Sequence, residues 1–171
     1  MSDDELIEKI KGGNEAAAKE LIDRYYAAIL RYCGWHCAVP DRAEDLAQET
    51  FFKLFRSLPR YRGRKKFKAY LYTIANRLCI DESRKMSFYS LEDAETIASG
   101  QNEITLAEHR EDIRRLLGVL SEEQREAVIL RFGQELGFSE IAKVMGCGMR
   151  TAQSRVRNAL RLMKRECGDE R

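Results

Sequence analysis

The chain has 171 residues, of which 44% are hydrophobic and 34% charged, and its formal net charge is +2. The hydrophobic content excludes a wholly disordered chain, and no apolar run approaches the roughly 20 residues that span a bilayer. The acidic N-terminus, MSDDELIEKI, has no signal-peptide core, and the odd number of cysteines, five, argues against a disulfide framework and predicts a reducing cytoplasm.

The first half of the chain has the pattern of helices separated by short breaks. Apolar residues recur at helical spacing over residues 6–32, interrupted by a Gly-Gly pair. A new helix is predicted from Asp41, where Glu44 completes a capping box, to about Leu58. A basic turn, RYRGRKK, follows it, and the spacing then predicts a helix over 67–84.

The second half begins a new helical series after a polar stretch over 86–105, which carries acids but no Lys or Arg. One amphipathic helix is predicted there, and Ser121 with Gln124 forms a capping box for the next. Ser139 is predicted to cap a short helix, SEIAKVM. The sequence GCG then makes a tight turn into a final helix over 149–165.

These elements predict an all-α fold with two small helical domains, 1–85 and 106–171, joined by an acidic linker over 86–105. Two basic zones without a single acid, at 60–68 and 141–165, lie one in each domain. They indicate two contacts with one polyanion, although an ordinary solvated surface could also carry such charges.

The last two predicted helices have the layout of a helix-turn-helix: a short helix, a glycine turn and a longer helix. One face of the final helix is apolar and predicts packing on the preceding helices: Ala152, Val156, Ala159, Leu160 and Met163. The other face can bind phosphates or base edges: Arg150, Thr151, Ser154, Arg155, Arg157, Asn158, Arg161 and Arg165. A solvated helix carries acids as readily as bases, so the absence of acids favours insertion into a major groove.

The helix DRAEDLAQETFFKLFRSL is predicted to bury one stripe and to expose a ridge opposite it. The stripe is apolar and consists of Ala43, Ala47, Phe51, Leu54 and Leu58. The ridge consists of Asp45, Glu49, Phe52 and Arg56. A phenylalanine among charged side chains costs solvation unless it is covered, which indicates a protein-binding face. The alternative is that another helix of the same domain covers Phe52, and the spacing alone does not decide between them.

The helix over 67–84 combines aromatic and basic side chains on the flank of its predicted core. The core side is Phe67, Leu71, Ile74, Ala75 and Leu78, and the flank is Lys66, Tyr70, Thr73, Asn76, Arg77 and Arg84. Interleaved rings and cations are what an unpaired nucleic-acid strand needs, because bases stack on the rings and cations hold the phosphates. Half-buried helix packing is the alternative explanation for the tyrosines.

Taken together, these segments resemble sigma factors of the extracytoplasmic-function (ECF) group of the sigma-70 family. DRAEDLAQETFFKLFRSLPRYRG resembles the core-binding part of sigma region two, and FKAYLYTIANRLCIDESRK resembles the melting and minus-ten part that follows. The stretch from LSEEQREAVILRF to the end of the final helix resembles sigma region four. The resemblance implies an alternative sigma factor, without enzymatic activity or cofactor, that directs core RNA polymerase to promoters.

The resemblance also implies roles by position. The contact with core polymerase falls on the ridge helix: Asp45, Leu46, Gln48, Glu49 and Phe52, with Arg56 beside them. Melting of the minus-ten element and binding of its non-template bases fall on the basic turn and its helix: Arg62, Arg64, Lys65, Lys66, Tyr70, Tyr72, Thr73, Asn76 and Arg77. Reading of the duplex minus-thirty-five element falls on the final helix: Arg150, Thr151, Gln153, Ser154, Arg155, Arg157, Asn158 and Arg161. An anti-sigma factor that covers both domains is a further implied partner.

Two other hypotheses follow from the sequence. A stand-alone regulator could bind duplex DNA through the C-terminal half, but that leaves the ridge and the tyrosine-rich helix unexplained. CGWHC places three possible metal ligands, Cys33, His36 and Cys37, within five residues. A zinc site needs about four ligands, so Cys79 or another protein would have to supply one, and buried thiols beside a helix-end histidine are the simpler expectation.

Overall fold

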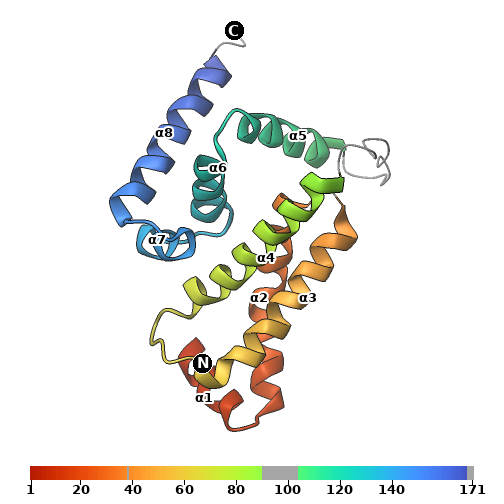
Figure 1. The fold of residues 1–171 in the computed structure, drawn as a ribbon, viewed down its shortest axis with the longest axis vertical. Helices are drawn as coiled ribbons and strands as arrows, with labels where there is room; N and C mark the ends of the chain where they lie inside the picture. Colours follow the sequence, from red (N-terminus) through yellow and green to blue (C-terminus); the bar gives the residue numbers. More distant parts are fainter. Residues whose placement is uncertain (38, 90–103, 169–171) are drawn as a thin grey trace. The chain divides into compact units, whose positions relative to one another are not determined.

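The computed structural model describes residues 1–37, 39–89 and 104–168, and every regular element in these ranges is helical (Figure 1). The chain divides into two compact units, Met1–Ala94 (unit 1) and Glu95–Arg171 (unit 2). The all-α class is confirmed. Residues 90–103, most of the predicted linker, lie outside the described residues.

Unit 1 contains α1 (Asp3–Lys11), α2 (Glu15–His36), α3 (Pro40–Ser57), a short 3-10 turn (Leu58–Arg60) and α4 (Phe67–Tyr89). The helices α2, α3 and α4 pack on one another, and α1 packs on α2 and on the 3-10 turn. Their shared core is apolar and aromatic, with Leu21, Ile29, Tyr32, Leu54, Phe67, Leu71 and Tyr72 almost fully buried.

Local sequence explains where the first helices begin. The hydroxyl of Ser2 accepts a hydrogen bond from the Glu5 amide, and the Glu5 carboxylate accepts one from the Ser2 amide, which makes a capping box for α1. Asn14 caps α2 by accepting from the Ala17 amide.

Two predicted boundaries in unit 1 are wrong. The helix α3 begins at Pro40 after an extended Val39, without a side-chain cap, so the predicted capping box of Asp41 and Glu44 is not formed. Proline suits the first turn of a helix because an amide hydrogen there would have no partner within the helix. The helix therefore begins at Pro40, one residue before the predicted start at Asp41. At the other end, α4 continues five residues beyond the predicted Arg84, to Tyr89.

Unit 2 contains α5 (Ile104–Gly118), α6 (Glu122–Val128), a π-helical segment (Ile129–Gly133), α7 (Phe138–Met145) and α8 (Met149–Gly168). The helix α8 packs mainly on α6 and α7. The capping box of Ser121 and Gln124 is confirmed.

The cap predicted at Ser139 is wrong. Gly137 is the N-cap of α7 instead, and its amide donates to the Glu140 carboxylate at 2.8 Å. The turn into α8 uses Gly146 at φ +65, a left-handed conformation that glycine adopts at little cost. None of the described helices combines the length and the hydrophobicity that a membrane span requires.

Candidate functional site

The ridge predicted on α3 is exposed. Phe52 is 57% exposed, and the guanidinium of Arg56 lies 5.6 Å from the centre of its ring. Asp45, Gln48 and Glu49 are exposed on the same helix. The alternative that the domain itself covers Phe52 is therefore wrong, and the apolar stripe opposite the ridge is buried as predicted.

Leu46 does not belong to this exposed surface. It is 7% exposed, and its carbonyl accepts a hydrogen bond from the hydroxyl of buried Thr50 at 2.7 Å. Its position one residue after Asp45 turns it toward the core side of the helix, so the exposed ridge consists of Asp45, Gln48, Glu49, Phe52 and Arg56.

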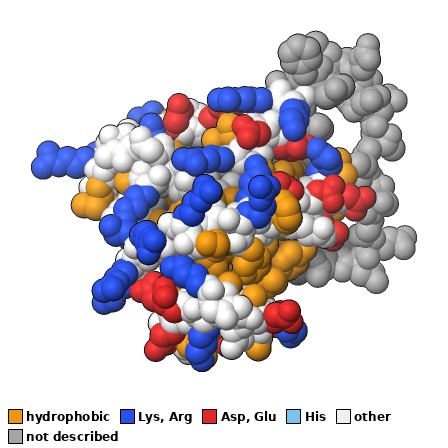
Figure 2. Space-filling view, turned by 60° about the horizontal axis from the view of Figure 1, so that its bottom comes forward, with side chains coloured by type: hydrophobic (Ala, Val, Ile, Leu, Met, Phe, Trp, Pro, Cys, Tyr) orange, Lys and Arg blue, Asp and Glu red, His pale blue; other side chains and the backbone are white. Residues whose placement is uncertain are grey.

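The basic loop between the 3-10 turn and α4 presents four cations to solvent: Arg62, Arg64, Lys65 and Lys66. Lys65 has φ +55, a left-handed conformation that lysine rarely adopts. Together with α1, the loop lines a hollow of about 360 Å³. In Figure 2, Lys and Arg side chains, coloured blue, are spread over the face in view.

An aromatic cluster of Tyr61, Phe67 and Tyr70 packs at the two ends of the loop. The ring of Tyr61 lies 4.6 Å from that of Tyr70 and 6.2 Å edge-on from that of Phe67, measured between ring centres. Burial raises the pKa of the Tyr61 hydroxyl. Tyr70 is half-buried, and its hydroxyl donates to Ser57 at 2.5 Å, so its ring is held at the edge of the loop.

Two residues predicted to contact the unpaired strand lie in the core instead. Tyr72 is 1% exposed, and its ring packs edge-on at 5.4 Å against that of Tyr32. Asn76 is 6% exposed, and its amide donates to the Tyr32 hydroxyl at 3.0 Å. Burial raises the pKa of Tyr72, and neither side chain reaches the surface on which a base could stack.

The rest of the predicted flank of α4 is accessible. Arg77 is exposed, and Thr73 is half-buried with its hydroxyl bound to the carbonyl of Ala69 at 2.7 Å. The exposed cations of the loop, half-buried Tyr70 and Thr73, and exposed Arg77 therefore form the part of the predicted strand-binding surface that solvent can reach.

The helix α8 carries the predicted basic face. Arg150, Thr151, Gln153, Arg157, Asn158 and Arg161 are exposed, and Ser154 and Arg155 are half-buried. The Arg157 guanidinium donates to the Ser154 hydroxyl at 3.1 Å. Ala152, Val156 and Ala159 are buried as predicted, whereas Leu160, predicted on the same apolar face, is 43% exposed. Residues 149–165 contain no acid to oppose an approaching phosphate.

The cysteine and histidine cluster does not converge on a metal site. In the ranges that the structure describes, no three His, Cys, Asp or Glu side chains lie close enough together to hold a metal ion. The two buried sulfurs of Cys33 and Cys79 are 4.0 Å apart, so Cys79 does approach the cluster. Burial raises the pKa of the Cys37 thiol to about 11, which keeps it protonated at neutral pH.

Comparison with known proteins gives the family. Residues 21–88 match the model of Sigma-70 region 2, and residues 110–163 match Sigma-70, region 4. The chain is 24% identical to the ECF RNA polymerase sigma factor SigW of Bacillus subtilis, over 95% of both chains. The chain belongs to the ECF group of the sigma-70 family. It is also 28% identical to the ECF RNA polymerase sigma-E factor of Escherichia coli, over 91% of this sigma factor and 89% of that one.

Two solved structures are similar to this sigma factor. The sigma factor RpoE of Bartonella quintana, solved in complex with the anti-sigma factor NepR, is 25% identical with a TM-score of 0.71, over 90% of this chain and 98% of that one. CnrH, solved in complex with the cytosolic domain of CnrY, shares the fold with a TM-score of 0.78 at 19% identity, over 97% of each chain.

The sequence pattern missed the residues that hold the basic loop in place. Asp4 and Lys11 of α1 contact it, although α1 precedes the segment that matches Sigma-70 region 2. Asp4 lies 61 residues before its partner Lys65, and no local periodicity joins positions so far apart.

Proposed function

We propose that this sigma factor binds core RNA polymerase through the exposed ridge of α3 and directs it to promoters. The observation that carries the proposal is Phe52, which is 57% exposed between Glu49 and Arg56 on the ridge, opposite a complete core stripe. Aromatic side chains are enriched where proteins bind each other, and an exposed phenylalanine gains solvation free energy when a partner covers it.

The DNA contacts divide between the two units. We assign opening of the minus-ten element to Arg62, Arg64, Lys65, Lys66, Tyr70, Thr73 and Arg77 of residues 1–85. We assign reading of the minus-thirty-five element to α8, within residues 106–171, through Arg150, Thr151, Gln153, Ser154, Arg155, Arg157, Asn158 and Arg161. Exposed cations and a fixed ring suit a melted strand, and an acid-free helix after a glycine turn suits a major groove.

In vitro transcription tests the proposal directly. Purified chain and core polymerase are incubated with a pool of promoter fragments, and initiation is mapped at base resolution. We expect initiation at discrete sites that requires both the chain and core polymerase. A chain that binds duplex promoter DNA tightly alone but gives no core-dependent initiation would be a stand-alone regulator instead.

We also infer an anti-sigma partner and a cytoplasmic location. RpoE of Bartonella quintana was solved with an anti-sigma factor, and the present sigma factor resembles it over nearly its full length. A protein that works on core polymerase and promoter DNA has to be where both are. Purification of the tagged chain from its native cells tests this: a partner that blocks core binding is expected in the soluble complex.

A further inference from the structure

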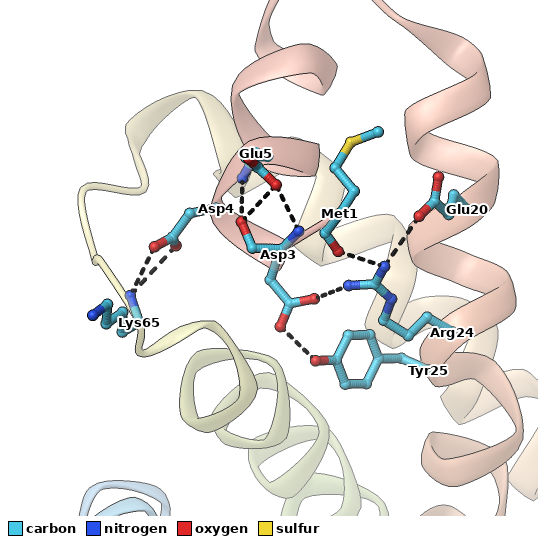
Figure 3. Close-up of polar contacts among 9 residues, drawn as sticks. Met1, Asp3, Asp4, Glu5, Glu20, Arg24, Tyr25 and Lys65 are labelled. Carbon is cyan, nitrogen blue, oxygen red and sulfur yellow. Dashed lines mark hydrogen bonds and ion pairs between the residues drawn. The ribbon is translucent and has the colours of Figure 1, made fainter.

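The helix α1 reaches across to the basic loop and binds its most unusual residue. The carboxylate of Asp4 accepts a hydrogen bond from the backbone amide of Lys65, at 3.1 Å to one oxygen and 3.4 Å to the other (Figure 3). Lys65 is one of two described non-glycine residues with positive φ. A side chain in that conformation costs about 1 kcal/mol or more and persists only where the surroundings hold it.

A second contact holds the other end of the same loop. The ammonium group of Lys11, on the last turn of α1, donates to the carbonyl of Tyr61 at 3.0 Å. Between these two anchors the loop folds tightly over the Tyr61 ring: a Cβ on Gly63 would lie 2.5 Å from the Tyr61 hydroxyl oxygen. The loop is thus fixed at both ends and packed in the middle.

The helix α1 is itself bound to α2. The Asp3 carboxylate accepts from the Arg24 guanidinium at 2.8 Å and from the Tyr25 hydroxyl at 2.6 Å, both on α2 (Figure 3). The same guanidinium donates to the Met1 carbonyl at 2.8 Å. These bonds join α1 to α2, so the helix that presents Asp4 to the loop is itself anchored.

We infer that Asp4 is a positioning residue for promoter opening: it holds Lys65 in the left-handed conformation and thereby fixes the cations of the loop before DNA arrives. The inference deepens the proposed function and rests on it. A carboxylate beside four cations weakens their attraction for phosphate, so attraction alone gains nothing from Asp4. Its contribution is conformational, because a preformed loop loses less entropy when it binds a melted strand.

The test separates initial promoter binding from the later opening step in complete holoenzyme. The rate of open-complex formation is measured against holoenzyme concentration for Asp4→Ala, Asp4→Asn and the control Glu15→Ala. Glu15 is an exposed acid in the first turn of α2 and is not among the residues that line the hollow. Asparagine keeps an oxygen that accepts from the Lys65 amide but has no charge.

For Asp4→Ala we expect an opening rate about three- to tenfold lower, because the variant loses the net contribution of one hydrogen bond. Initial binding to the promoter should be unchanged or tighter. Asp4→Asn should restore most of the rate, and Glu15→Ala should behave as wild type. Equal rates for Asp4→Ala and wild type, faster opening in both Asp4 variants, or equally slow opening in both would overturn the inference.

Hydrogen exchange of the Lys65 amide gives a readout that needs no polymerase. Asp4→Ala should speed this exchange in the free protein, while amides in the core of α2 and α4 stay protected. Unchanged Lys65 exchange would overturn the inference even if opening slows. If wild-type chain supports no core-dependent initiation, the proposed function fails; if it does and Asp4→Ala matches it, only the positioning role fails.

Discussion

The hydroxyl of Tyr70 donates a hydrogen bond to the hydroxyl of Ser57, which in turn donates to the carbonyl of Leu54. This short relay joins the first turn of α4 to the last turn of α3. It fixes the Tyr70 ring beside the basic loop, at the boundary between the surface proposed for the polymerase and the surface proposed for DNA.

Replacing Tyr70 should impair strand opening more than initial DNA binding. Stacking of a base on a ring is worth about 1–3 kcal/mol and becomes available only when strands part. Tyr70→Ala should therefore lower permanganate reactivity of minus-ten thymines at equal occupancy of the promoter. Tyr70→Phe keeps the ring and loses only the bond to Ser57, so it should retain most of the reactivity. Unchanged reactivity in Tyr70→Ala would remove this residue from the strand-binding surface.

Changes on the α3 ridge should weaken core binding without loosening the fold. Phe52→Ala should reduce affinity for core polymerase by about 2 kcal/mol or more, as for other aromatic interface residues, and Glu49→Lys should act in the same direction. Fluorescence titration of labelled core polymerase measures both.

Two controls separate binding from folding on the same helix. Glu44→Lys changes an exposed acid that lies off the ridge and should leave core affinity unchanged. Phe51→Ala should lower the free energy of unfolding by about 3–5 kcal/mol because Phe51 is 5% exposed, whereas Phe52→Ala should barely alter it. Wild-type core affinity in both Phe52→Ala and Glu49→Lys would move the polymerase interface elsewhere.

Single alanine substitutions in α8 should distinguish residues that read bases from residues that bind phosphates. The candidates are Arg150, Ser154, Arg155 and Arg157. Losing an arginine that is bidentate to guanine lowers the binding free energy by about 1–3 kcal/mol on the cognate duplex only. Losing a phosphate contact weakens binding to all duplexes alike and lowers the slope of log binding constant against log salt concentration by about one.

The measurement uses holoenzyme with cognate and scrambled minus-thirty-five duplexes across a salt series. Arg110→Ala, an exposed arginine on α5, is the matched control and should leave the cognate-to-scrambled ratio unchanged. If none of the four substitutions alters that ratio, the four side chains anchor the backbone and α8 does not set the sequence preference.

The Cys37 thiol should react slowly and with a displaced pH dependence. Burial is the main cause that raises its pKa from 9.0 to about 11, and the neighbouring Cys33 and Glu82 add to it. Because the thiolate is the reactive form, alkylation by iodoacetamide at pH 8 should be about a hundredfold slower than in urea-unfolded protein, and should climb until about pH 11. Since the folded pKa is the higher one, the stability linked to this thiol is complete below pH 9 and is lost as the pH rises toward 11.

Peptide mapping by mass spectrometry follows Cys37 separately from the other cysteines. Exposed Cys167 serves as an internal reference, and buried Cys33 and Cys79 should react only on unfolding. Equal alkylation rates for Cys37 in folded and unfolded protein at pH 8 would contradict the predicted shielding.

The sequence predicted some of the features that depend on near neighbours, although the local caps expected at Asp41 and Ser139 are wrong. The capping box at Ser121 is formed by a residue three positions away, and the buried stripe of α3 follows from helical spacing alone. The burial of Asn76 depends on its hydrogen bond to Tyr32, 44 residues earlier. The angular position of Asn76 on its helix therefore did not predict that burial. The contact of Asp4 with Lys65 is longer in range still and left no pattern in the chain.

The acid-free face of α8 has a cost when no DNA is present. Arg157 and Arg161, and Arg161 and Arg165, lie four residues apart, the spacing at which like charges on a helix repel each other. Anions from the salt relieve this repulsion in the free protein, yet the same anions compete with the promoter phosphates for these arginines in the complex. Rising salt therefore stabilises α8 in the free protein and weakens the complex of α8 with its promoter.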